Sequence, residues 1–191
     1  MMKLLLSSIL LVFSIAGCMH SPKSTYYTLS APPIPAEPTR SNIRVMVGPV
    51  ALSDLLDQPR LVVQSGSNEV KLYDYHRWAG SLKSEVGRVV SANLATDLGT
   101  SKVWVFSQST QIDFDYQVLI DVQNLESKPD EHVLLDILWT IKPKNEKKKT
   151  IVGRSLIREP VTGHGIGAMV AAQSLAFAKA SADIAKAIGQ L

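Results

Sequence analysis

Two stretches in the second half of the chain alternate strictly between apolar and polar side chains. In residues 114–122, one face carries Phe114, Tyr116, Val118, Ile120 and Val122. In residues 133–141, one face carries Val133, Leu135, Ile137, Trp139 and Ile141. A period of two with one polar face is typical of antiparallel strands packed on one side. The polar turn at residues 128–131 predicts that the two strands form a hairpin.

Two helices are expected to cover that sheet. Residues 78–98 repeat apolar side chains at helical spacing, and Gly99 follows as a natural helix stop. Residues 166–188 are rich in alanine, the strongest helix former. Shorter strands are predicted over residues 26–29, 43–50 (ended by Gly48 and Pro49), 60–64, 70–75, 102–106 and 150–159. The whole predicts a single α+β domain, a mostly antiparallel sheet with two main helices packed on one face.

The N-terminus has the layout of a secretory signal. Lys3 precedes about a dozen apolar residues, a segment too short to span a bilayer. Residues 15–18, Ile-Ala-Gly-Cys, resemble the bacterial lipobox, and Cys18 is the one cysteine of the chain. We therefore expect lipidation at Cys18 by diacylglycerol and an amide-linked acyl group such as palmitate, because two or more chains anchor durably. The alternatives are a plain signal peptide with an incidental cysteine, or a buried membrane anchor.

This anchor divides the chain into three parts. We expect a signal peptide over residues 1–17, a lipidated tether over 18–25 and one folded domain over 26–190. Met19 follows the cysteine where aspartate would favour retention in the inner membrane, so the expected location is the outer membrane, facing the periplasm. The prolines at 32, 33, 35 and 38 indicate an extended segment, either a spacer or a strip that docks a partner.

The residues that carry chemistry form no recognisable catalytic set. None of the four histidines has the spacing of a zinc site, and no G-x-S-x-G motif is present. Asp113 and Asp115 share a predicted strand face, which is more typical of a solvated sheet than of a glycosidase pair. The glycines of residues 163–167 lack the pattern of a phosphate-binding loop. We expect no catalysis, no metal and no cofactor.

A run of lysines follows the second alternating stretch, over residues 142–149. Such a run is usually a solvated hairpin turn, although it could also contact anionic phospholipid headgroups. The formal charge of +3 is too small to indicate a partner by itself. Nucleic acid is excluded as a partner because the expected compartment is the periplasm.

Several short motifs occur in a particular order along the chain. They are YYTL at residues 26–29, VGPVAL at 47–52, LLDQPRLV at 55–62, HRWAGSL at 76–82, SANLATDLGT at 91–100 and VW at 103–104. This ordered set resembles the family of ABC-type transport auxiliary lipoproteins, and in particular its PqiC (YmbA) group. Gln58 is a departure, since the family often has arginine there, and Arg60 lies two positions later.

The resemblance implies a non-enzymatic outer-membrane lipoprotein that serves an MCE-type lipid transport or membrane-integrity system. The implied partners are an MCE-domain protein similar to PqiB, an inner-membrane component similar to PqiA, outer-membrane phospholipid through the anchor, and further copies of the chain. The alternatives are a lipoprotein that itself carries phospholipid and, least favoured, a periplasmic enzyme. Candidate partner contacts are Tyr26, Tyr27, Pro32, Pro33, Lys147, Lys148 and Lys149.

Overall fold

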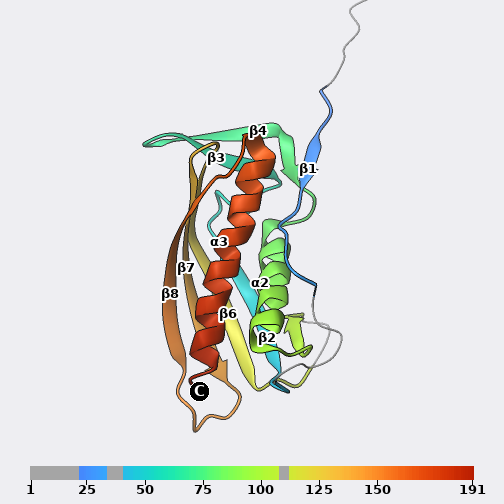
Figure 1. Cartoon of the computed structure of the whole chain (residues 1–191), viewed down its shortest axis with the longest axis vertical. Helices are drawn as coiled ribbons and strands as arrows, with labels where there is room; N and C mark the ends of the chain where they lie inside the picture. The colour runs from blue at the N-terminus through green and yellow to red at the C-terminus, as the bar shows by residue number, and fades with distance from the viewer. Residues whose placement is uncertain (1–21, 34–40, 108–111) are drawn as a thin grey trace, which may run out of the picture.

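Two sheets and two helices make up the fold, shown in Figure 1. The structure is a computed structural model that describes residues 22–33, 41–107 and 112–191. A five-stranded sheet has the order β5-β2-β6-β7-β8, and a three-stranded sheet has the order β1-β4-β3. The single-domain α+β prediction is confirmed. Within the described ranges, neither helix is long and apolar enough to cross a bilayer.

The five-stranded sheet is built around the predicted hairpin. Its strands are β5 (Val103–Val105), β2 (Val45–Leu52), β6 (Tyr116–Lys128), β7 (His132–Pro143) and β8 (Ile151–Pro160). β6 and β7 pair antiparallel from Tyr116 opposite Pro143 to Lys128 opposite His132, and β8 continues the antiparallel order. The alternating apolar residues from 116 to 122 and from 133 to 141 are buried, as the period of two predicts.

The sheet is mixed, because β2 lies parallel to both β5 and β6. The prediction that Gly48 and Pro49 end this strand is wrong. They form a cis peptide inside β2, where the register shifts between Val47 and Val50, and pairing with β6 then resumes to Leu52. Proline has no N–H to donate, so a bulge is a position where a strand can accept it.

The helix predicted to begin at Trp78 begins later. Trp78 is the last residue of β4, and α2 (Leu82–Leu98) starts after Ser81, whose side chain accepts a hydrogen bond from the Ser84 N–H at 3.2 Å. This N-cap sets the helix start, since it satisfies one of the free backbone donors. Gly99 ends α2 with φ of 62°, as predicted.

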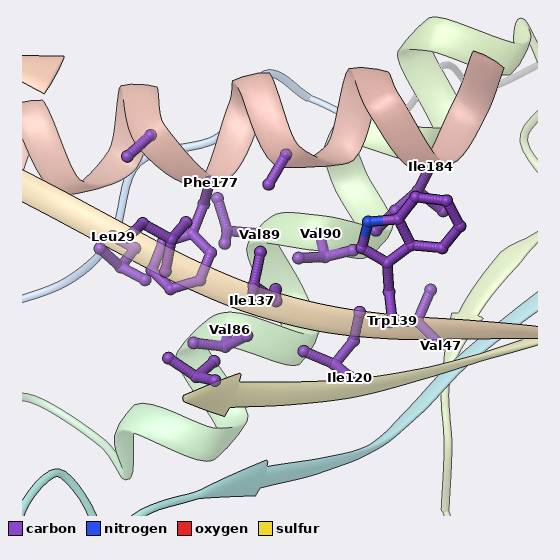
Figure 2. Close-up of a cluster of buried hydrophobic side chains, with 14 of the residues drawn as sticks. Leu29, Val47, Val86, Val89, Val90, Ile120, Ile137, Trp139, Phe177 and Ile184 are labelled. Carbon is purple, nitrogen blue, oxygen red and sulfur yellow. The ribbon is translucent and has the colours of Figure 1, made fainter. Parts of the chain in front are cut away.

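The core lies between the helices and one face of the five-stranded sheet. α2 packs beside β2 and β5, and α3 (Gly165–Ile188) packs on β7 and β8 and against α2. Figure 2 shows Phe177 and Ile184 of α3 directed toward Ile137 and Trp139 of the sheet. Small buried residues on α3, including Ala172, Ala176, Ala180 and Ser181, let this helix approach its neighbours closely.

The three-stranded sheet lies at one end of the molecule. It consists of β1 (Thr25–Tyr27), β4 (Glu69–Trp78) and β3 (Arg60–Gly66), with β1 parallel and β3 antiparallel to β4. In Figure 1 this sheet is at the top, beside the start of α3, while the C-terminus and the loop between β7 and β8 are at the bottom. The described chain begins at the end that carries the three-stranded sheet.

Candidate functional site

The predicted lipidation site, Cys18, and the predicted signal peptide lie outside the described residues. The first described residue is Pro22, and β1 begins at Thr25. Thr25 lies seven positions after Cys18, a distance of at most about 25 Å when the chain is fully extended. An acyl group on Cys18 would therefore hold the three-stranded sheet near the membrane surface.

The candidate partner contacts near the N-terminus differ in exposure. Tyr26 is 61% exposed, whereas the Tyr27 hydroxyl lies 2.8 Å from His76 Nδ1, and burial raises the pKa of Tyr27. Pro32 and Pro33 are exposed. The chain just before them is held on α3, because the Ser30 N–H donates to Ser174 Oγ at 2.9 Å. The remainder of the proline-rich segment, residues 34–40, lies outside the described residues.

The candidate lysines belong to the loop between β7 and β8, at the opposite end from Tyr26 (Figure 1). Lys147 and Lys149 are exposed. The Lys148 ammonium donates to the Tyr116 hydroxyl at 2.7 Å and to the Leu191 carbonyl oxygen at 2.8 Å. The tyrosines and the lysines therefore do not form one continuous surface.

Asp113 and Asp115 are partly exposed to solvent, as expected, but they also form ion pairs. Both precede β6, and Arg44 binds Asp113 at 2.5 Å and Asp115 at 2.6 Å. Lys144 makes a further ion pair with Asp113. Hydrogen bonds from Lys144 and Arg44 hold the pKa of Asp113 below its usual range, and the bond from Arg44 does the same for the pKa of Asp115. These ion pairs hold the start of β6 against Arg44. Carboxylates that stay ionised and paired in this way are poorly suited to proton transfer.

The motif stretches contact one another in pairs. The Ala79 N–H donates to the Tyr27 carbonyl at 2.8 Å, and the Trp78 N–H donates to the Pro59 carbonyl at 2.8 Å. Gln58 Oε1 accepts from Arg60 Nε at 3.2 Å, so Gln58 orients the arginine that follows it. Residues 57–59 and 78–82 line a hollow of about 330 Å³. These contacts connect β1, the start of β3 and the segment that leads from β4 into α2, which is a structural role.

An aromatic cluster on the three-stranded sheet was missed from the sequence. Tyr73 meets the His76 ring edge-on at a centroid distance of 5.3 Å, and Lys71 Nζ lies 5.0 Å from the Tyr73 ring centroid. Tyr75 is 47% exposed on the same strand. The run L-Y-D-Y-H-R at residues 72–77 was the available signal, but only a short strand was inferred from it.

The second surface missed from the sequence is the face of the five-stranded sheet opposite the helices. Val152 and Leu156 on β8 are 69% and 64% exposed, and Arg154 between them forms an ion pair with Asp136 of β7 at 2.5 Å. A hollow of about 370 Å³ on this face is lined mostly by apolar residues, among them Pro49, Leu119, Leu138 and Val152. Apolar side chains that stay exposed together are typical of protein contact surfaces.

Neither a metal site nor a helix-end ligand site emerges from the described ranges. These ranges contain no group of three histidine, cysteine, aspartate or glutamate side chains able to hold a metal ion. At the glycine-rich start of α3, the Gly165 N–H donates to Asp130 Oδ1 at 2.9 Å. A carboxylate from the β6–β7 turn thus occupies a donor that an anion would need.

Comparison with known proteins gives one family and several similar folds. The model of the family "ABC-type transport auxiliary lipoprotein component" matches residues 27–185. A crystal structure described as an uncharacterized protein is 21% identical, with a TM-score of 0.70 over 87% of this chain and 99% of that chain. Protein XCC0632 from Xanthomonas campestris is 18% identical, with a TM-score of 0.65 over 85% of this chain and 93% of that one. No curated protein matches by sequence. At these identities the structural likeness shows a shared fold.

Proposed function

Because the chain belongs to the family of ABC-type transport auxiliary lipoprotein components, we propose that it serves an MCE-type, Pqi-like lipid transport or membrane-integrity system. In this proposal it is a non-enzymatic lipoprotein of the outer membrane. It docks the periplasmic end of a tunnel made by an MCE-domain protein similar to PqiB, which works with an inner-membrane component similar to PqiA. The family match over residues 27–185 is the observation that carries the proposal.

The anchor is the second part of the proposal. The lipobox ending in Cys18, followed by Met19, supports lipidation and retention at the outer membrane, with the domain in the periplasm. Family membership supports a lipoprotein in the cell envelope. Acyl chains in the phospholipid leaflet leave the folded domain free to contact a second component.

The partner contact is assigned to surfaces away from the anchor. The exposed β8 face with Val152 and Leu156 and the loop with Lys147 and Lys149 both belong to the β7–β8 hairpin. This hairpin carries apolar and cationic side chains, which suits a protein partner with apolar and acidic groups. A homo-oligomer that matches the symmetry of the tunnel would repeat this surface around a ring.

The close packing of the core favours a docking role over a role as a phospholipid carrier. The space between the helices and the sheet is filled by fully buried side chains such as Phe177, Met169 and Ile184. The hollow of about 540 Å³ beside the Arg44 ion pairs is lined by Asp115, Lys144 and Lys148 as well as apolar groups. A site for acyl chains needs an apolar, enclosed lining.

The test is a pull-down from solubilised envelopes with the tagged full-length protein, compared with Cys18→Ala. Co-purification of an MCE-domain protein with the wild type supports docking. Loss of that protein with Cys18→Ala would make anchoring part of the mechanism, whereas retention would place recognition in the folded domain. Absence of any MCE-domain protein from both samples would overturn the proposed partner. Phospholipid found in native mass spectra of the unlipidated variant would then favour the carrier function.

A variant pair locates the contact. Val152→Glu with Leu156→Glu changes the apolar surface without touching the core, because both side chains are exposed. We expect this double variant to lose the MCE-domain protein. The control is Ser67→Glu with Asn68→Glu in the exposed β3–β4 turn, which adds the same charge at the other end and should retain the partner.

A further inference from the structure

We propose that the outward face of the three-stranded sheet rests on the phospholipid headgroups of the membrane that holds the acyl chains of Cys18. This inference rests on the proposed function, because it requires the lipid anchor. It goes further by assigning a second, non-covalent membrane contact and an orientation of the domain. We call this surface the β1-β4-β3 face, and it comprises Tyr26, Arg60, Val62, Val70, Leu72 and Arg77.

The register of the sheet determines which side chains belong to this face. Leu61 and Val63 of β3 are buried, so Arg60 and Val62 point the other way. Arg77 lies opposite Arg60, and on its other side Arg77 lies beside Tyr26 of β1. Leu72 and Val70 lie opposite Val62 and Gln64, which places them on the same outward face.

The composition of this face is that of a membrane interface. Tyr26 and Val70 are 61% and 41% exposed, and the neighbouring Tyr75 is also exposed. Tyrosine combines an apolar ring with a polar tip and is enriched where hydrocarbon meets water. Arg60 and Arg77 give this face two cations, and among the described residues the one carboxylate paired with them is Asp74, which contacts Arg60.

One of these cations has spare hydrogen-bonding capacity. Arg60 contacts Asp74 at 3.4 Å, and Asp74 is therefore partly neutralised. Arg77 Nε is buried without a hydrogen-bond partner among the described residues, and no ion pair is formed by Arg77 there. Because that Nε atom is buried, the donors that reach a lipid phosphate are those of Arg60, whose side chain is 37% exposed; a phosphate accepts paired N–H donors.

The length of the tether identifies the membrane as the occupant. Thr25 is at most about 25 Å along the chain from Cys18. α3 has 24 residues and extends about 36 Å from this end of the molecule toward the other. The acyl anchor thus brings the β1-β4-β3 face to the bilayer, while the loop with Lys147 at the far end points into the periplasm (Figure 1).

The single cysteine allows a direct test. Acylation occupies the Cys18 thiol in the mature lipoprotein, so an introduced cysteine is the one free thiol for a nitroxide label. The labelled variants are Val70→Cys on the β1-β4-β3 face and Lys147→Cys as the matched control, both at exposed positions. Each full mature lipoprotein is studied in detergent and then in vesicles of phosphatidylethanolamine and phosphatidylglycerol at a ratio of about 3:1.

The measurement is collision of the label with a water-soluble nickel chelate and with oxygen. We expect nickel accessibility at Val70→Cys to fall several-fold in the vesicles and oxygen accessibility to rise, with no change at Lys147→Cys. Equal nickel accessibility at both positions in the vesicles would overturn the proposal. Protection at Val70→Cys already in detergent would assign this face to a contact between copies, which also overturns it.

A second experiment separates this proposal from the anchor itself. The mature chain, residues 18–191 with Cys18→Ser, is floated with the same vesicles and with pure phosphatidylcholine, alongside the variant that adds Tyr26→Ser and Tyr75→Ser. We expect weak binding to the anionic vesicles that falls several-fold in the tyrosine variant. If mass spectrometry finds Cys18 unacylated in the native protein, the proposed anchoring fails while flotation still tests the face. Equal flotation of the two chains would contradict the face alone.

Discussion

Gly153 offers the sharpest test of how the core is packed. It lies opposite Trp139 across the β7–β8 pair, and a methyl group added at Gly153 would come within 2.2 Å of the indole ring. The Trp139 N–H donates to Ser155 Oγ at 3.2 Å, and Ser155 in turn donates to Asp183 of α3 at 2.7 Å. The indole ring of Trp139 therefore packs directly against the backbone of β8 at Gly153.

The change Gly153→Ala must move that ring. Forcing an extra methyl group into a packed core costs about 1–3 kcal/mol. Loss of the indole hydrogen bond adds about 1 kcal/mol. We expect a loss of about 3 kcal/mol in the free energy of unfolding, which corresponds to a fall in Tm of about 6–12 °C for a domain of this size.

The assay is thermal and urea unfolding of the Cys18→Ser chain, followed by circular dichroism. Gly167→Ala is the matched control, because nothing lies within 4 Å of its added methyl group and its helical position should gain about 0.5–1 kcal/mol. In a Trp139→Leu background, Gly153→Ala should cost less than about 1 kcal/mol, because the clashing ring atoms are gone. A Tm for Gly153→Ala equal to or above that of the parent chain would refute the packing of the indole on β8.

Three further predictions concern the ends of elements. Ser81→Ala removes the acceptor for the Ser84 N–H and should cost about 1 kcal/mol in urea unfolding, whereas Ser81→Asp should be nearly neutral. Gly99→Ala places a side chain at a φ of 62° and should cost about 1–2 kcal/mol, whereas Gly99→Asn should cost less; equal losses would argue against the left-handed cap. Arg44 lowers the folded-state pKa of Asp115, so this stabilisation is complete above about pH 4 and is lost as pH falls through the lower folded value. The difference between the urea midpoints of wild type and Arg44→Gln should therefore be largest at pH 7 and shrink as pH falls below about 4; a difference that does not change with pH would point to another cause.

Local patterns predicted much of the sheet and both helices. Alternation placed Val118 and Ile137 on buried faces, because the side-chain period of a strand is two whatever its neighbours are. The turn at residues 128–131 and the stop at Gly99 were also predictable, since turn and cap residues act on their immediate backbone. The family resemblance rested on ordered motifs, and the match over residues 27–185 confirms it.

Pairing between distant segments could not be predicted. Alternation shows which face of a strand is buried but not which strand lies beside it, so the parallel position of β2 between β5 and β6 was not inferred. Gly48 and Pro49 have the composition of a strand end, and only the register with β6 shows them to be a bulge within β2. Trp78 fitted a helical period, but its N–H donates instead to the carbonyl of Pro59, the residue just before β3.

The candidate functional residues also divide into those that the sequence identifies and those that only the tertiary structure brings together. By itself the sequence determined the lipobox at Cys18, the hydrophobic period of the strands and the helix-forming segments, because each depends on neighbouring residues alone. Only the tertiary structure decided that Arg44 binds Asp113 and Asp115, and that Tyr26 and Lys147 lie at opposite ends. Contacts between residues far apart in sequence depend on how sheets and helices pack together, and that packing is a property of the whole chain.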